Sequence, residues 1–134
     1  MTDAAQLRQR YLAQSVMSAT PARLLVMLYD RLALDLGRAE KAQLNGDRTA
    51  ANEQLLHAQD IVSELMATLD VDAWDGAPGL LALYTFLHGE LVRANTSMSA
   101  EKTRACLAIV EPLREAWTAA AEPAPLAGEV ATVA

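Results

Sequence analysis

Apolar residues recur in steps of three and four along four stretches of the chain, and this spacing predicts four amphipathic helices. The first helix is expected over residues 20–44. Thr20 can cap its start, and Pro21 suits the first helical position because its fixed φ matches the helix. Asn45-Gly46 provides a left-handed stop. The core stripe of this helix consists of Leu25, Leu28, Leu32, Leu36 and Ala39.

Asp47 can cap a second helix, and residues 70–79 are expected to form the loop after it. This segment collects Asp, Gly and Pro, which favour turns. Trp74 within the loop is expected to fold back as a lid over the end of the bundle. The seam of the second helix is Ala51, Leu55, Ala58, Val62, Leu65 and Leu69.

A third helix follows the loop and is expected to end near Asn95-Thr96-Ser97, and Ser99 can cap a fourth helix over residues 100–121. Pro112 removes one backbone hydrogen bond inside the fourth helix, so we expect a bent helix rather than two helices. The third seam is Leu80, Tyr84, Leu87, Leu91 and Ala94, and the fourth is Cys106, Val110, Leu113, Trp117 and Ala120.

These elements predict an all-α protein, an antiparallel up-down four-helix bundle, because short connections favour antiparallel neighbours. We expect an N-terminal capping segment over residues 1–19 and the bundle over residues 20–121. Residues 122–134 carry Pro and Gly without a seam, which predicts a disordered C-terminal tail. A length of 134 residues suits one domain with its own core.

Several apolar side chains lie off the four seams. On the first helix they share a side with charged residues, a mixture expected where an apolar groove is rimmed by charge and covered by another chain. Another element of the same chain could equally cover them, because a central helix can be buried on two sides. The off-seam set is Val26, Met27, Leu34, Leu56, Ile61, Phe86 and Val92.

Composition narrows the class of partner. Hydrophobic residues make up 52% of the chain and aromatic residues only 4%, so the apolar content is mainly Ala and Leu, which are strong helix formers. The net charge of -6 argues against nucleic acid or an anionic membrane as the main partner. Cys106 is the single cysteine, so no disulfide framework exists, and we expect it to be buried. The sequence contains no secretory signal and no run as long as a membrane span, and we expect a cytoplasmic protein.

Candidate chemistry is limited by the presence of only two histidines, His57 and His88. A di-iron bundle needs two Glu-x-x-His steps, whereas Glu53 precedes His57 by four residues and no second copy occurs. A histidine phosphotransfer domain remains an alternative, although neither histidine is followed closely by a cation that would admit phosphate. The sequence contains no Gly-rich phosphate-binding loop, and its motifs do not indicate a nucleophile beside a general base. We therefore expect no enzyme activity, no bound metal and no cofactor.

Four phrases follow one another along the chain: YLAQSVMSATPARLLVMLYDRL, HAQDIVSELMATLDVD, GLLALYTFLHGELVRAN and EPLREAWTAA. In this order and at these separations they resemble the flagellin-specific secretion chaperone family, FliS, over about residues 11–121. The chain departs from the family pattern at His57, where the family usually has Lys, and at Phe86, where Tyr is common.

The resemblance implies a chaperone that holds the C-terminal disordered segment of flagellin in the cytoplasm, prevents its polymerisation and assists its delivery to the flagellar export gate. The off-seam residues would then form an apolar track for flagellin. Tyr11 matches the family's N-terminal Tyr motif, and we hypothesise that Tyr11 and Val16 cover part of the groove until flagellin displaces them. Capping of the core by Tyr11 is the alternative. We expect a monomer or a weak homodimer in the absence of flagellin, and a purely structural homo-oligomer remains a third alternative function.

Overall fold

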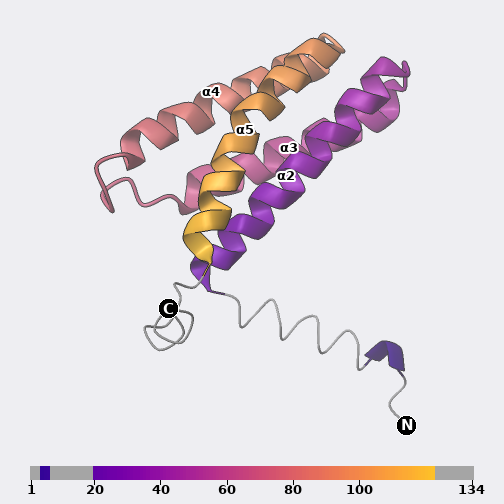
Figure 1. Ribbon diagram of the computed structural model, residues 1–134. Helices are drawn as coiled ribbons and strands as arrows, with labels where there is room; N and C mark the ends of the chain where they lie inside the picture. The colour runs from indigo at the N-terminus through magenta and orange to yellow at the C-terminus, as the bar shows by residue number, and fades with distance from the viewer. Residues whose placement is uncertain (1–3, 7–19, 123–134) are drawn as a thin grey trace, which may run out of the picture.

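Four long helices follow one another in the computed structural model, which describes residues 4–6 and 20–122 (Figure 1). Residues 4–6 are helical, and the long helices are α2 (Pro21–Leu44), α3 (Arg48–Thr68), α4 (Ala77–Thr96) and α5 (Ala100–Ala121). No strand occurs in the part of the chain that the structure describes. The predicted all-α bundle is thereby confirmed. The capping segment with Tyr11 and Val16, and the tail beyond Glu122, lie outside the described residues.

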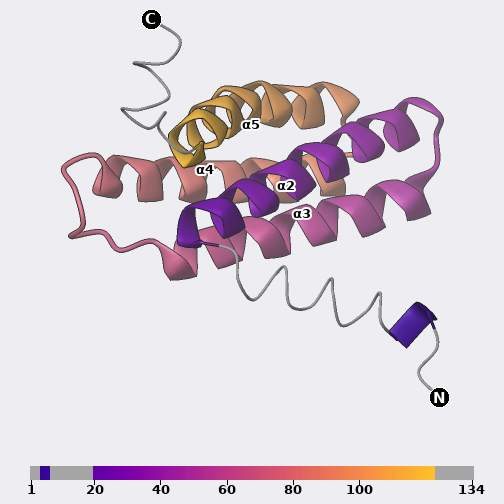
Figure 2. The same cartoon turned by 60° about the horizontal axis from the view of Figure 1, so that its bottom comes forward.

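The helices form an up-down bundle in which α2 packs against α3 and α5, and α4 packs against the same two helices. Figure 2 shows α2 running between α5 and α3. Helices α2 and α4 therefore face each other across the core. The start of α2, the end of α5 and the loop between α3 and α4 lie together at one end of the bundle (Figure 1).

The predicted caps explain where the helices begin and end. The side chains of Thr20, Asp47 and Ser99 each accept a hydrogen bond at 3.1 Å from the backbone N–H three residues further on. Gly46 has φ of +73°, a left-handed conformation that a residue with a side chain adopts only with strain. These local signals fix the lengths of α2, α3 and α5.

The predicted start of α4 was wrong, whereas the prediction that α5 is a single helix is confirmed. Helix α4 begins at Ala77, so Pro78 and Gly79 belong to its first turn rather than to the loop. Pro is tolerated there because the first N–H groups of a helix have no partner within it. Pro112 leaves α5 as one helix, as predicted, and α5 curves along its length (Figure 1).

The core lies along the predicted seams, except that Ala120 of the α5 seam is exposed and some residues outside the seams are buried. The seam residues of α4 and most of those of α3 are buried. Val26 and Ile61, expected to lie off the seams, are 2% and 6% exposed and belong to the core. They are buried because each helix packs against two neighbours, which makes its apolar face wider than a single stripe. Tyr29 on α2, which the stripe omitted, is fully buried as well.

Buried polar side chains connect the helices within this core. The hydroxyl oxygens of Tyr29 and Tyr84 lie 2.5 Å apart and join α2 to α4. Towards the other end, Gln43 Nε2 donates to the Ala94 carbonyl at 3.1 Å, and Gln43 Oε1 accepts from Thr103 Oγ1 at 2.6 Å. No buried side-chain N or O atom of the described residues lacks a hydrogen-bond partner, so these contacts link α2, α4 and α5 while offsetting the cost of removing the polar groups from water.

A buried carboxylate joins α2 to α3. Asp35 is 0% exposed, and it accepts a hydrogen bond from Arg31 Nε at 3.0 Å while its second oxygen contacts His57 Nδ1. A charge this deeply buried requires such partners, because it has lost its water. His57 therefore has a structural function in this bundle.

We expect Asp35→Asn to lower the free energy of unfolding by about 2–3 kcal/mol, because the buried acceptor loses its charge while Arg31 and His57 keep their donors. Urea unfolding followed by circular dichroism measures this. Asp30→Asn is the matched control, since Asp30 is 51% exposed where it binds Arg114 Nε at 2.7 Å. An exposed pair contributes only about 0–1 kcal/mol. An equal decrease in the free energy of unfolding in the two variants would show that the contribution of Asp35 does not depend on its burial.

Candidate functional site

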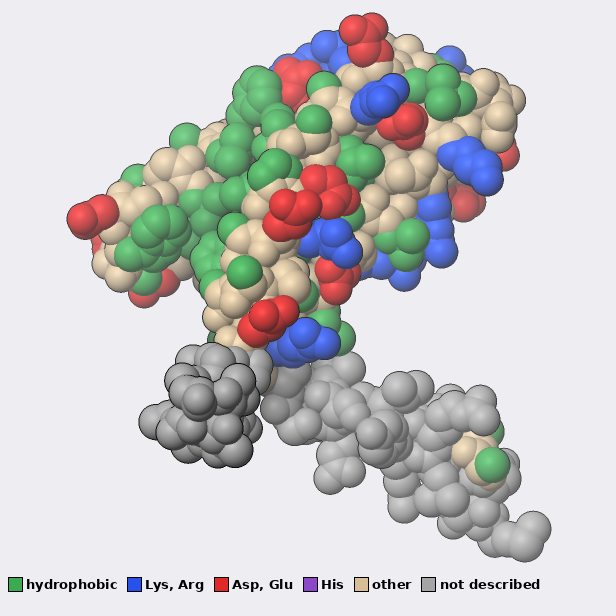
Figure 3. Space-filling model, viewed as in Figure 1, with side chains coloured by type: hydrophobic (Ala, Val, Ile, Leu, Met, Phe, Trp, Pro, Cys, Tyr) green, Lys and Arg blue, Asp and Glu red, His purple; other side chains and the backbone are tan. Residues whose placement is uncertain are grey.

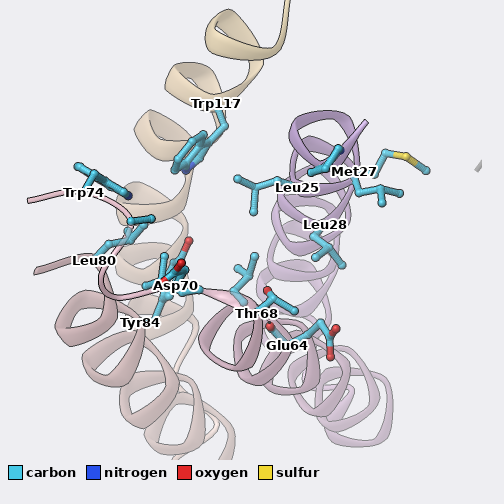
Figure 4. A pocket seen from close by; sticks show the side chains of 15 residues that line it. Leu25, Met27, Leu28, Glu64, Thr68, Asp70, Trp74, Leu80, Tyr84 and Trp117 are labelled. Atoms are coloured by element: carbon cyan, nitrogen blue, oxygen red, sulfur yellow. Dashed lines mark hydrogen bonds between the residues drawn. The ribbon is translucent and has the colours of Figure 1, made fainter. Parts of the chain in front are cut away.

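An apolar pocket of about 660 Å³ lies at the end of the bundle where α2 starts and α5 ends. We call it the end pocket. Side chains from all four long helices and from the loop between α3 and α4 line it (Figure 4). Its lining residues are Pro21, Leu24, Leu25, Met27, Leu28, Glu64, Leu65, Thr68, Leu69, Asp70, Ala73, Trp74, Leu80, Tyr84 and Trp117.

The Tyr29–Tyr84 pair lies between the end pocket and the rest of the core, since Tyr84 lines the pocket and Tyr29 is fully buried. Burial raises the pKa of Tyr29 above its ordinary value; the hydrogen bond to Tyr84 adds to this, and the Trp117 side chain offsets part of it. Burial also raises the pKa of Tyr84. Both hydroxyls therefore stay protonated at neutral pH and act as a structural pair.

Trp74 and Trp117 are the two tryptophans of the chain, and both line the end pocket. They approach it from the loop and from α5 (Figure 4). Trp74 lies against Gly76, where a Cβ atom would overlap the six-membered ring. Trp74 therefore lies at the end of the bundle, as predicted for a lid, but it covers the pocket only in part, since the residue remains 51% exposed.

The polar lining of the end pocket is acidic. Glu64 on α3 and Asp70 at the start of the loop contribute carboxylates, and no Lys, Arg or His is among the lining residues. Asp70 Oδ1 accepts a hydrogen bond from the Asp72 N–H at 3.0 Å. Among the described residues neither Glu64 nor Asp70 forms an ion pair. The pocket therefore combines apolar walls with a negative rim.

Five of the off-seam residues are exposed as predicted, but they do not form one continuous track. Met27 lines the end pocket, and Leu34 lies two turns further along α2 on the same face. Leu24, also exposed beside Met27, was missed because its spacing resembles that of the neighbouring core stripe. The exposed members of the predicted set are Met27, Leu34, Leu56, Phe86 and Val92.

The remaining exposed members lie on two other faces. The hydrogen bond from Asn95 Nδ2 to Asn52 Oδ1 marks where α3 and α4 meet, and Leu56 and Val92 are each within one turn of it. Phe86 lies one turn before Glu90, whose ion pair with Lys102 marks the boundary of α4 with α5. Figure 3 shows hydrophobic side chains gathered along that boundary. Apolar side chains are therefore exposed on at least three sides of the bundle.

The side chains with potential chemical reactivity, Cys106 and His88, lie in or beside the core. Burial raises the pKa of the Cys106 thiol to about 11, and the negative charge of Glu90 adds to the rise, so the thiolate needed for chemistry is scarce at neutral pH. His88 is half-buried beside the α4 seam. The described residues contain no group of three or more His, Cys, Asp or Glu arranged to hold a metal ion. Within the same residues, no helix combines the length and apolarity that a membrane crossing requires.

Comparison with known proteins points to one family. Residues 3–124 match the family described as "Flagellar protein FliS". The chain is 32% identical over 107 residues to the flagellar secretion chaperone FliS of Bacillus subtilis, with 80% of each chain covered. It is 32% identical over 105 residues to the flagellar secretion chaperone FliS of Salmonella typhimurium, covering 77% of this chain and 78% of that protein.

We expect Gly76→Ala to displace the Trp74 ring from its seat, because the new Cβ overlaps it. In a Trp117→Phe background Trp74 is the sole tryptophan, so its emission maximum should move to longer wavelength as the ring enters water. Gly79→Ala is the matched control, since nothing lies within 4 Å of a Cβ there. An unchanged spectrum in the Gly76→Ala variant would mean that the ring is not seated on Gly76.

Proposed function

The chain belongs to the FliS family of flagellar secretion chaperones, and from this premise we propose that it binds the C-terminal disordered segment of flagellin in the cytoplasm. Bound in this way, flagellin would be kept from polymerising before export. The complex would then deliver it to the flagellar type III export apparatus, whose gate is the second proposed partner.

The observation that carries this proposal is the distribution of exposed apolar side chains over several sides of a small bundle. A globular partner would cover one side, whereas an extended chain that folds on contact can reach all of them. Each Leu, Ile or Val of the partner that becomes buried contributes about 1.5–3 kcal/mol. Ordering each partner residue costs about 1–2 kcal/mol, so several separate contacts are needed for a stable complex.

The proposed contact residues are the exposed ones. Met27 is suited to a surface that accepts different side chains, because its unbranched thioether adapts its shape. Tyr11 and Val16 remain proposed as a removable cover of the flagellin groove. The exposed residues proposed to contact flagellin are Met27, Leu34, Leu56, Phe86 and Val92.

Two other functions predict different behaviour. In a structural homo-oligomer the exposed apolar residues would bind a second copy, and the assembly would persist when flagellin is added. In a phosphotransfer domain His57 or His88 would accept a radiolabelled phosphoryl group. The Asp35 contact already accounts for His57, and the family consists of chaperones rather than enzymes.

We expect a peptide covering the C-terminal disordered segment of flagellin to bind one to one, with a large negative heat-capacity change, because apolar surface is buried as the peptide folds. Calorimetric titration at several temperatures measures both. Met27→Gln should weaken binding about tenfold, the effect of losing one buried side chain. Leu44→Gln, which changes a residue 71% exposed at the far end of the bundle, should leave the affinity unchanged. Absence of binding by a folded, monomeric chain would refute the proposal.

We expect removal of residues 1–17 to lower the dissociation constant for the same peptide, because a segment competing for the groove is gone. Titration of the shortened and full-length chains under identical conditions measures the difference. A variant carrying Tyr11→Ala and Val16→Ala in the full-length chain serves as the second test. Dissociation constants equal to that of the unmodified chain in both cases would show that these residues do not cover the groove.

A further inference from the structure

The end pocket differs from the other exposed apolar positions in its chemistry. The other positions are single side chains on helix surfaces, whereas the end pocket encloses about 660 Å³ between four helices and a loop. This volume falls within the range of about 300–1,000 Å³ that is typical of ligand sites. It is large enough for several bulky apolar side chains presented by one amphipathic segment.

The negative charge at the rim restricts which charged residues of a ligand can lie beside the apolar side chains that enter the pocket. Glu64 and Asp70 lie at the edge of apolar walls, and no cation among the described residues pairs with either of them. Some carboxylates elsewhere in the bundle, such as Asp30 and Glu90, bind Arg or Lys of the same chain, whereas many others also lack an ion pair among the described residues. What distinguishes Glu64 and Asp70 is therefore their position in the lining of the apolar pocket. An acidic ligand would be repelled here and a cationic side chain attracted, and because Glu64 and Asp70 are exposed, salt would weaken both effects.

We infer that the end pocket is a specificity site for an amphipathic segment that inserts bulky apolar side chains and carries Lys or Arg beside them. The apolar side chains would lie against Leu25, Leu28 and Leu80, and the cation would pair with Glu64 or Asp70 at the rim. This inference rests on the proposed function for the identity of the partner, which would be a basic stretch of flagellin's C-terminal segment. The chemistry of the pocket stands independently of that identity.

The test uses two 16-residue amphipathic peptides with the same Leu and Phe face, one with Lys and one with Glu at the flanking positions. Because both tryptophans of the chain line the end pocket, the intrinsic emission of the full-length protein reports on this site. The Lys peptide should shift the emission to shorter wavelength and bind about tenfold more tightly than the Glu peptide at low salt. This preference should shrink as salt screens the rim charges.

The variant Glu64→Gln/Asp70→Asn should abolish the preference while leaving the apolar walls intact. The variant Glu53→Gln/Asp60→Asn is the matched control, because it removes the same charge from exposed positions of α3 that do not line the pocket. Equal binding of the two peptides, a preference that survives the rim substitutions, binding without an emission change, or no binding of either peptide would each overturn the inference.

The same rim variant separates this inference from the proposed function. If flagellin's segment binds the unmodified chain and the rim variant equally, the chaperone function stands and the pocket inference fails. If the Lys peptide binds as expected and flagellin does not, the pocket inference stands and its assignment to flagellin fails. If the emission maximum moves to shorter wavelength and the sedimentation mass increases as the protein concentration is raised, the pocket is occupied by a second copy and the inference is overturned.

Discussion

The contact between the hydroxyls of Tyr29 and Tyr84 sets the distance between α2 and α4, the two helices that face each other across the core. Both side chains are buried, and neither hydroxyl could lose its partner without a desolvation cost. The other helices pack on either side of this pair. The spacing of the bundle at this level is therefore determined by two polar atoms rather than by the volume of apolar side chains alone.

The end pocket exists because the helices pack less closely on one side of the Tyr29–Tyr84 pair than on the other. Towards the Gln43–Thr103 contact the helices bury continuous seams, and their ends are held by caps and by side chains that reach between helices. Towards the pocket, α4 and α5 separate, and the loop with Trp74 closes only part of the space between them (Figure 1). The apolar side chains there have fewer partners within the chain, which makes this end the place where burial by another molecule adds most.

The sequence was sufficient to predict the helices, because their signals are local. Thr20, Asp47 and Ser99 act as caps whatever the rest of the chain does, and Gly46 stops α2 by its own conformational freedom. The burial of Tyr29 and Asp35 was not predicted, since their partners are 55 and 22 residues away along the chain. Val26 and Ile61 were assigned to the wrong side because a stripe drawn at 100° per residue shows where a helix is most buried, but not how wide that face is. The end pocket depends on how helices diverge, which no local pattern encodes.

Pro112 makes one wall of the end pocket easier to deform than the others. It lacks the N–H that would bind the Ala108 carbonyl, and it divides α5 into a first half anchored by Thr103, Cys106 and Val110 and a second half whose Trp117 is only partly buried. The second half can fray at a lower free-energy cost than the first, and its backbone amides should exchange with solvent hydrogen sooner. The wall of the pocket that Trp117 forms is therefore its compliant side. A guest too wide for the resting cavity would be accommodated by bending the last turns of α5, while the Tyr29–Tyr84 pair and the seams beyond it keep their positions.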